Sequence, residues 1–416
     1  MSKKFILKES TRKRCKIVPA TDELIQMFRP ISLDHFSYLW EVPTIEFSIF
    51  IRIEKEIIEY IRPSELSHEL LQHIWAVSLR DDAGVDVFIQ KKDFPKFEHT
   101  LAFVRQKKIN HLIEKDPSLD RKTLEVFGDL SGASQMILRG GITKSVAERV
   151  KSAAAHMVNQ LMDNDFAMST LSRMITIDPT LYDHSASVAM FATIMARQYI
   201  NPNLPFKDAE ILTQCGLYHD AGKSCIPNAI LNKPGSFTPE EFEVMKTHAL
   251  LGYKELSHAI NSGAPIDELA ARVALEHHER FTGKGYPMGK RGRLEEDPIH
   301  GIHIYTRMVS IADAYSALLM KRVYKPALPV EMALEMLQRS PDDFDSAIME
   351  PFIEGVRGSL KQLKVKRDKM RAGNIYMLGE HDNLVAKINE TRQANLKPDA
   401  GEPEEALPRK LPKAGP

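Results

Sequence analysis

One pair of neighbouring residues, His219-Asp220, constrains this chain more than any other feature, because it stands at the end of an apolar helical stretch. It lies in CGLYHDAGKSCIP, Cys215–Pro227, and offers a metal ion an imidazole and a carboxylate from the same turn. Taken alone, the pair is better explained as a helix cap or a surface hydrogen bond. Three further stretches favour a helical hydrolase site, since each has a nitrogen or oxygen donor near an apolar helical segment: His248 in MKTHALLG, His277-His278-Glu279 in ALEHHER and Asp313 in SIADAYSAL.

The totals exclude several classes of protein. With 416 residues the chain can form two or three domains. Hydrophobic residues are 43% and charged residues 27%, which is ordinary for a globular protein, and the formal net charge of zero points to neither nucleic acid nor a membrane surface. The one basic cluster, Lys3–Lys16, is interpreted as part of a solvated tail over residues 1–20, with nucleic-acid contact as a minor alternative.

The sequence also predicts where the protein works. We find no apolar run long enough to span a bilayer and no apolar core of a secretory signal. Three cysteines, an odd and sparse set, favour a reducing cytoplasm and no disulfide framework. Cys215 and Cys225 flank the His-Asp pair but are interpreted as small core residues rather than metal ligands.

Residues 21–115 predict a small α/β domain. Its role is unclear from the sequence, and regulation is one possibility. Ile45–Ile53 alternates apolar and polar residues and predicts a strand, and Val85–Ile89 predicts a second one. Between them, Ser64–Leu71 predicts a helix with Ser67 as its N-cap. No catalytic cluster is visible in this region, where scattered histidines are interpreted as ordinary surface or buried residues: His68, His73 and His99.

From about Leu119 the pattern is helical almost everywhere. We expect connecting helices over residues 116–170, of which Ser145–Met162 is amphipathic enough to connect domains or to form a dimer. Thr238-Pro239-Glu240-Glu241 predicts a helix start with a capping box, and that helix is expected to carry His248. Other predicted helices that carry candidate donors are Tyr182–Gln198 with His184, Asp208–Tyr218 before the His-Asp pair, Asp267–Arg280 with the double histidine, and Ile304–Arg322 with Asp313.

Together these motifs strongly resemble the HD-GYP family, a branch of the HD phosphohydrolases that hydrolyses cyclic di-GMP. The resemblance covers roughly residues 170–360 and implies a mainly α fold. An all-helical HD-type core over residues 171–365 is preceded by the small α/β domain and followed by a polar tail, 366–416, expected to be disordered at its end. Seven matches occur in the family's order: His219-Asp220 with Gly222-Lys223, Ile226-Pro227, Lys233-Pro234-Gly235, His248, His277-His278-Glu279-Arg280, Gly285-Tyr286-Pro287 and Ile311-Ala312-Asp313.

The resemblance implies two divalent metal ions as cofactors. Nitrogen and carboxylate donors without a thiolate suit iron or manganese, which the family uses, and do not exclude zinc or nickel. Two cations about 3.5–4 Å apart can activate water and neutralise a phosphodiester. The implied ligands, with Asp220 as the bridge, are His184, His219, Asp220, His248, His277, His278 and Asp313.

Four further residues are implied to bind substrate. Lys223 would reach the phosphate oxygens and, with Asp220, serve catalysis. Arg322 stands in KRVY, where family members often have DRPY, and would bind a phosphate. Tyr286 would line the entrance. Asp178, six residues before His184, matches a family position near the metals, although an ordinary loop aspartate is an equal explanation.

Several positions depart from the family pattern. Thr180 replaces the glutamate of members with a third metal, so we expect a two-metal site with pGpG as main product and GMP as minor product. The other departures affect substrate fit and rate more than metal binding: Thr282 for Asp, Lys284 for a small hydroxyl residue, Ser316 for Asp, Val323 for Pro, and a longer segment Lys290–Thr306.

Three functions stay open. The first is an active cyclic di-GMP phosphodiesterase, which the full ligand set favours. The second is a slow or inactive domain that binds either the dinucleotide or, at the GYP loop, a signalling protein. The third is a general nucleotide phosphohydrolase, which leaves the double histidine and the GYP loop unexplained. The sequence does not distinguish cyclic di-GMP from hybrid cyclic GMP-AMP, and it leaves a homodimer open.

Overall fold

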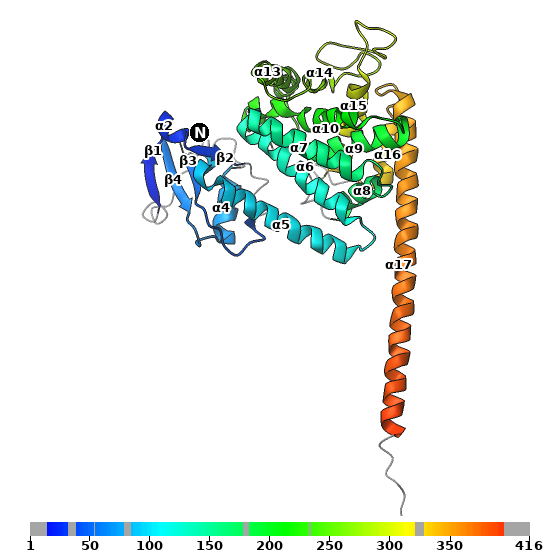
Figure 1. Ribbon diagram of the computed structural model, residues 1–416. Helices are drawn as coiled ribbons and strands as arrows, with labels where there is room; N and C mark the ends of the chain where they lie inside the picture. The colour runs from blue at the N-terminus through cyan, green and yellow to red at the C-terminus, as the bar shows by residue number, and fades with distance from the viewer. Residues whose placement is uncertain are drawn as a thin grey trace, which may run out of the picture. The chain divides into compact units, whose positions relative to one another are not determined.

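The computed structural model places five short strands in one sheet near the N-terminus (Figure 1). It describes residues 15–31, 39–53, 55–78, 85–177, 183–231, 233, 235–320 and 328–394. The chain divides into two units, Met1–Lys364 and Val365–Pro416. Within the described residues, no helix combines the length and the apolar character that a membrane span needs.

The sheet is antiparallel throughout and has the strand order β1-β4-β3-β5-β2. Residues of helices α4 and α5 pack on one face of the sheet, around Leu71, Phe97 and Leu101. Helix α2 lies against the other face, around Phe28 and Phe88. The bounds are β1 (Lys16–Pro19), α2 (Asp22–Ile25), β2 (Phe28–Pro30), β3 (Ile49–Ile53), β4 (Glu56–Ile61), α4 (His68–Ser78), β5 (Val85–Gln90), η2 (Lys91–Asp93) and α5 (Phe94–Lys115).

The strand predictions were partly wrong. β5 is present as expected, but the strand predicted over Ile45–Ile53 begins only at Ile49. Ile45 and Phe47 are buried outside the ladder, so their alternation signals burial rather than a strand. β4 escaped detection because Ile57 and Ile58 are both buried, one on each face, which removes the alternation. The Ser67 cap is confirmed, since Leu70 N donates to its Oγ at 3.2 Å.

Two expected boundaries differ from the structure. β1 lies inside the expected tail 1–20, because Lys16–Pro19 pairs with β4. The helices expected to be connectors over residues 116–170 instead contribute buried residues to the main helical core. The apolar face of the amphipathic run at Ser145–Met162 is buried in that core, so the face that suggested dimerisation is occupied within this chain. These helices are α6 (Arg121–Gly140), α7 (Lys144–Leu161) and α8 (Ala167–Ile177).

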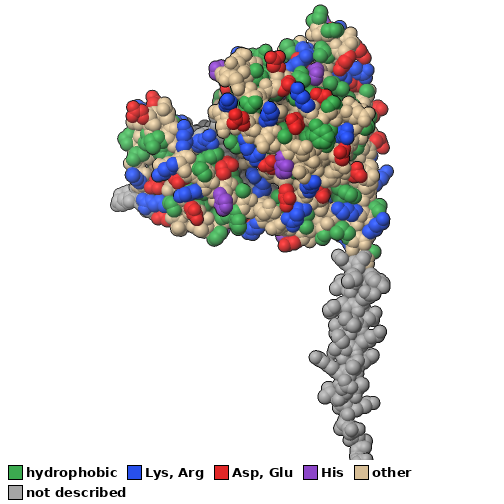
Figure 2. Space-filling model, viewed as in Figure 1, with side chains coloured by type: hydrophobic (Ala, Val, Ile, Leu, Met, Phe, Trp, Pro, Cys, Tyr) green, Lys and Arg blue, Asp and Glu red, His purple; other side chains and the backbone are tan. Residues whose placement is uncertain are grey.

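The helical core is all-α, as expected (Figure 1). Its central helix is α9, in which every residue after the first is buried. Lys, Arg, Asp and Glu side chains are interspersed over the face drawn in Figure 2, in line with the zero net charge. The remaining elements are α9 (His184–Met195), η4 (Ala196–Ile200), α10 (Phe206–Tyr218), η5 (Ala221–Cys225), α11 (Asn228–Leu231), α12 (Pro239–Lys246), α13 (His248–Asn261), α14 (Glu268–Glu276), α15 (Ile304–Leu319), α16 (Val330–Gln338) and α17 (Ser346–Ala394).

The predicted helix start at Thr238 is confirmed, with both hydrogen bonds of the capping box present. The prediction that the same helix carries His248 was wrong, because α12 ends at Lys246 and His248 begins α13. The tail expected from residue 366 remains helical to Ala394 in α17. The disorder predicted for Lys397–Pro416 lies outside the described residues.

Candidate metal centre

The side chains predicted to bind metal lie together in the helical core, although five helices supply them. His184 begins α9, His219 directly follows α10 and His248 begins α13. His277 directly follows α14 and precedes His278, while Asp313 lies within α15. Most donors are therefore at helix ends, where side chains from differently directed helices can converge.

Asp220 stands between two sets of imidazoles. Its Oδ2 lies 3.6 Å from His184 Nε2 and 3.3 Å from His219 Nε2. Its Oδ1 lies 3.5 Å from His248 Nε2 and 3.8 Å from His277 Nε2. Each oxygen of one carboxylate thus faces a different pair of nitrogen donors, which is the geometry of a bridging ligand.

Three groups of donors could each hold a metal ion, with ligand atoms within 4.8 Å of one another. On one side of Asp220, Asp313 Oδ1 lies 3.0 Å from His184 Nε2. On the other side, His248 Nε2 and His277 Nε2 are 3.3 Å apart. The groups are His184, His219 and Asp313; His219, Asp220 and His277; and His248, His277 and His278.

Two buried atoms at the centre show that a cation fits there. Among the residues that the structure describes, His219 Nε2 and Asp220 Oδ1 have no hydrogen-bond partner, although both are shielded from solvent. Buried polar atoms are normally paired, because an unpaired one costs about 1–3 kcal/mol. A cation between these donors would remove that cost, and hard or borderline divalent ions accept such a nitrogen and oxygen set.

Backbone carbonyls orient three of the imidazoles. The Nδ1 atoms of His219, His248 and His277 donate to carbonyl oxygens three residues earlier, at 2.8, 2.7 and 2.9 Å. A carbonyl only accepts, so each Nδ1 carries the proton and each Nε2 keeps a free lone pair for a metal. His184 is held differently, because its Nδ1 lies 3.1 Å from Ser316 Oγ.

Burial and neighbouring charges shift the pKa values of the donors in different directions. Burial lowers the pKa of His277 well below its usual value and that of His278 to about 3, so both imidazoles are neutral at pH 7. Burial alone would raise the pKa of Asp220, but Lys223 and His219 outweigh it and hold that pKa well below its usual range. Burial alone would lower the pKa of His219, but Asp220 outweighs it too and raises that pKa, so without a cation the pair favours a protonated His219 beside an ionised Asp220.

Two predicted substrate residues border this cluster. Lys223 Nζ lies 2.6 Å from Asp220 Oδ2, and its side chain is 31% exposed. Tyr286 stacks on His278 with ring centroids 4.7 Å apart and an interplanar angle of 29°. Asp178, Arg322 and the departure at Thr180 lie outside the described residues.

Sequence reasoning missed the roles of three supporting residues. Glu279 accepts hydrogen bonds from Met288 N at 2.7 Å and Lys290 N at 2.8 Å, and so closes the loop that carries Tyr286. Ser310 donates to the carbonyl of His277 at 2.6 Å. Ser316 was noted only as a departure, and nothing in the linear sequence shows its contact with His184.

Comparisons with known proteins match the part of the chain that carries these residues. A family model described as HD domain matches residues 169–348. A cyclic di-GMP phosphodiesterase of Thermotoga maritima is 42% identical over 137 residues, which are 33% of this chain and 34% of that protein. A probable cyclic di-GMP phosphodiesterase of Vibrio cholerae is 33% identical over 198 residues, 45% of this chain and 43% of that protein.

A third relative acts on a different dinucleotide. The 3'3'-cGAMP-specific phosphodiesterase 3 of Vibrio cholerae is 34% identical over 227 residues, which are 53% of this chain and 45% of that protein. The chain therefore spans less than half the length of each of these curated relatives.

Proposed function

Residues 169–348 form an HD domain of the HD-GYP type, and from this premise we propose that the protein hydrolyses a phosphodiester bond of cyclic di-GMP in a metal-dependent reaction. The observation that carries the proposal is Asp220, whose two oxygens each face a separate pair of imidazoles. A carboxylate placed in this way supports a centre of two cations rather than one.

The proposed ligands divide around Asp220. His184, His219 and Asp313 would hold one cation, and His248, His277 and His278 the other. Two divalent cations, when bound, supply an activated water and neutralise the charge of the phosphodiester. The absence of a thiolate from the donor groups supports iron or manganese.

The chain's own residues would receive the substrate. Lys223 is partly exposed beside Asp220, so its ammonium is placed to bind a phosphate oxygen that approaches the centre. Burial raises the pKa of the Tyr286 phenol, which therefore keeps its proton at neutral pH and can donate a hydrogen bond. Arg322 and Asp178 are proposed substrate residues from the sequence resemblance alone. With Thr180 in place of a glutamate, we propose pGpG as the main product.

Several finer assignments belong to the same proposal. Three free cysteines suit a reducing cytoplasm, where we place the enzyme. A homodimer and a signalling partner at the GYP loop are further proposals. Hybrid cyclic GMP-AMP is the alternative substrate, because relatives named for either dinucleotide have similar identity to this chain.

The test uses the full chain loaded with Mn(II) or Fe(II) and given cyclic di-GMP or 3'3'-cGAMP in separate reactions. We expect conversion of cyclic di-GMP to pGpG, with activity reduced to background in His219→Ala and in Asp220→Ala. His258→Ala is the matched control, because His258 is an exposed histidine on the same helix as His248 and should leave the rate unchanged.

The other outcomes identify the alternatives. Tight dinucleotide binding without turnover under any metal would instead indicate a binding module. Cleavage of nucleoside triphosphates with indifference to cyclic dinucleotides would indicate a general nucleotide phosphohydrolase.

A further inference from the structure

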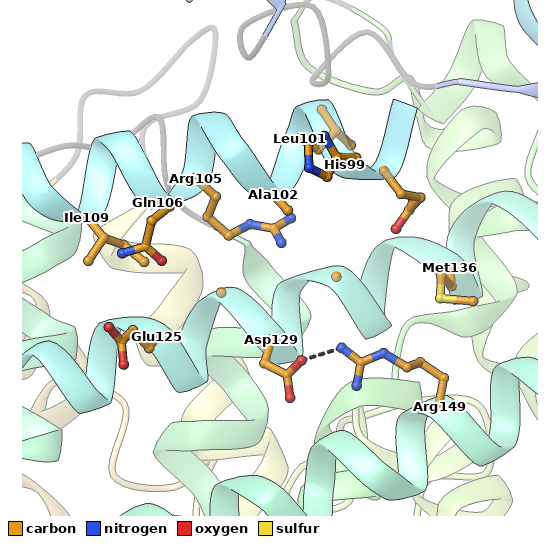
Figure 3. Close-up of a pocket in the computed structure, with 13 residues that line it drawn as sticks. His99, Leu101, Ala102, Arg105, Gln106, Ile109, Glu125, Asp129, Met136 and Arg149 are labelled. Atoms are coloured by element: carbon orange, nitrogen blue, oxygen red, sulfur yellow. Dashed lines mark hydrogen bonds and ion pairs between the residues drawn. The ribbon is translucent and has the colours of Figure 1, made fainter. Parts of the chain in front are cut away.

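Helix α5 belongs to two hydrophobic cores at once. Leu101 and Val104 pack in the core of the N-terminal sheet, whereas Ile109 and Leu112 pack in the helical core. Arg105 stands between these two sets of residues. Figure 3 shows its side chain reaching from α5 toward α6 along one wall of a pocket of about 460 Å³.

Two glycines of α6 make room for this side chain. A Cβ on Gly128 would lie 2.7 Å from Arg105 Cδ, which is closer than real Cβ atoms come. A Cβ on Gly132 would lie 3.6 Å from Nη1. Arg105 therefore lies directly on a bare stretch of the α6 backbone, and its Nε is buried without a hydrogen-bond partner among the described residues.

The same part of α6 holds an aspartate that adjoins the metal centre. Ser131 Oγ donates to Asp183 Oδ2 at 3.3 Å, and Ser134 also bonds to this carboxylate. Burial raises the pKa of Asp183, and the charge of Arg105 opposes that rise. Arg105 thus lies on the stretch of α6 whose hydroxyls hold Asp183, and its charge favours the ionised carboxylate.

Asp183 caps the helix that begins with a proposed metal ligand. Its Oδ1 accepts a hydrogen bond from Ala186 N at 2.9 Å, and its backbone is extended, as an N-cap requires. The next residue is His184, whose Nε2 faces Asp220 and Asp313. The direction of the His184 side chain therefore depends on this first turn of α9.

We propose that Arg105 is a positioning residue which, through Asp183, holds the first turn of α9 and His184 in place, and so links the N-terminal sheet domain to the metal centre. The proposal rests on the proposed function in that His184 is taken as a metal ligand. A shift of α5 would then alter metal binding, because Arg105 moves with that helix.

A second arginine of the same pocket provides the contrast. Arg149 on α7 forms an ion pair with Asp129, which also accepts a hydrogen bond from His156 at 3.1 Å. Figure 3 shows Asp129 and Arg149 facing each other across the lower side of the pocket. Arg149 thus shares the pocket with Arg105 but is paired with Asp129 of α6 and does not lie on the glycines beside Ser131.

The first experiment measures Mn(II) affinity of the full chain by titration calorimetry. Arg105→Ala should weaken binding by about three- to tenfold, less than the 10–100-fold typical of a residue that contacts a metal ligand directly. Arg105→Lys should keep most of the affinity, because it restores the charge. Arg149→Ala is the control and should bind Mn(II) as the wild type does. Millimolar guanidinium chloride should restore the affinity of Arg105→Ala, because the pocket has room for the ion.

A double-mutant cycle tests whether the effect passes through Asp183. Asp183→Asn keeps a good N-cap but removes the negative charge on which the charge of Arg105 would act. In that background, Arg105→Ala should cause no further loss of Mn(II) affinity. Hydrogen exchange at the Ala186 amide adds a readout that needs neither metal nor substrate, and it should be faster in Arg105→Ala than in Arg149→Ala.

The inference is overturned if Arg105→Ala binds Mn(II) like the wild type with unchanged exchange at Ala186. An equal loss in the Asp183→Asn background, or a loss that guanidinium does not restore, would also overturn it by indicating general damage to the fold. Failure of the proposed function looks different: the wild type would bind Mn(II) but leave cyclic di-GMP intact, while the dependence on Arg105 remained measurable.

Discussion

Ser316 shows how a residue that departs from the family pattern can still orient a proposed metal ligand, His184. Its hydroxyl lies 3.1 Å from His184 Nδ1, at the ring nitrogen that would not bind metal. A hydroxyl can accept the Nδ1 proton as a carboxylate does, but without a negative charge to make the imidazole more basic. We therefore interpret Ser316 as an orienting partner that gives less electrostatic support than aspartate would.

Substitution at Ser316 should change metal affinity without removing the centre. Ser316→Ala should weaken Mn(II) binding about tenfold, because partners of metal-ligating histidines contribute about 10–100-fold. Ser316→Asp should bind at least as tightly as the wild type. Titration calorimetry measures both, with exposed Ser262→Ala as the control. Equal affinities for all three variants would contradict the orienting role.

His303 gives the protein a pH-dependent helix cap. Its Nδ1 accepts a hydrogen bond from Tyr305 N at 3.1 Å, which requires an unprotonated nitrogen. Burial, together with the charge of Arg272, lowers its pKa to about 4, against about 6.5 in the unfolded chain. The unfolded state therefore binds more protons between these values, and stability falls as the pH drops from 6.5 through 4.

Replacing His303 should flatten this pH dependence. His303→Asn keeps a capping side chain but does not titrate. We expect its free energy of unfolding to fall less than that of the wild type between pH 7 and pH 4.5, by about 1–2 kcal/mol, because solvent screening at this half-buried side chain reduces the full linkage value. Urea unfolding of the metal-free protein at several pH values measures this difference. Parallel pH profiles for the two proteins would show that the cap does not titrate in this range.

At the scale of elements, the centre depends on how closely α9 and α10 approach. A Cβ on Gly216 would lie 2.4 Å from the Cα of Ala189, so only glycine allows the two backbones this contact. α9 carries His184, and His219 directly follows α10. Separation of these helices would therefore move His184 and His219 apart, and these two residues form one donor group with Asp313.

Gly216→Ala should damage both stability and metal binding. Overpacking of a core typically costs about 1–3 kcal/mol, and here backbone rather than a flexible side chain resists the new methyl group. We expect a loss near the upper end of that range, together with weaker Mn(II) binding. Gly358→Ala is the control: no atom lies within 4 Å of its added Cβ, and alanine favours a helix by about 1 kcal/mol. Urea unfolding measures the stability of both variants, and titration calorimetry measures their Mn(II) affinity. If Gly216→Ala were stabilised as Gly358→Ala is, the close contact would be refuted.

At the scale of the whole molecule, metal binding and folding should be linked. The donors come from helices α9, α10, α13, α14 and α15, so the unfolded chain lacks the centre. Mn(II) at one hundred times its dissociation constant should stabilise the native state by about 2.7 kcal/mol per site. Thermal unfolding should show a higher midpoint with Mn(II), reversed by EDTA and reduced in His219→Ala. If the thermal unfolding midpoint of the wild type does not change when Mn(II) is added, that result would argue against a metal centre.

Much of the helical core could be predicted from local patterns. Apolar periodicity and the capping box at Thr238 predict helices because the forces involved act within a few residues. The sheet was predicted less well, since β4 has adjacent buried residues on opposite faces and so no alternation. The helices expected to be connectors over residues 116–170 belong to the core, because one amphipathic helix does not show whether its apolar face packs in a shared core.

The sequence by itself determined which chemical groups are available: imidazoles and carboxylates in the family's order, and the helices that bear them. Only the tertiary structure decided that Asp220 turns one oxygen to each set of imidazoles, that Ser316 meets His184, and that Arg105 lies on the part of α6 whose hydroxyls hold Asp183. The physical reason is that donor type and helix formation are local properties of the chain. Distances between side chains far apart in sequence arise only when helices pack against one another.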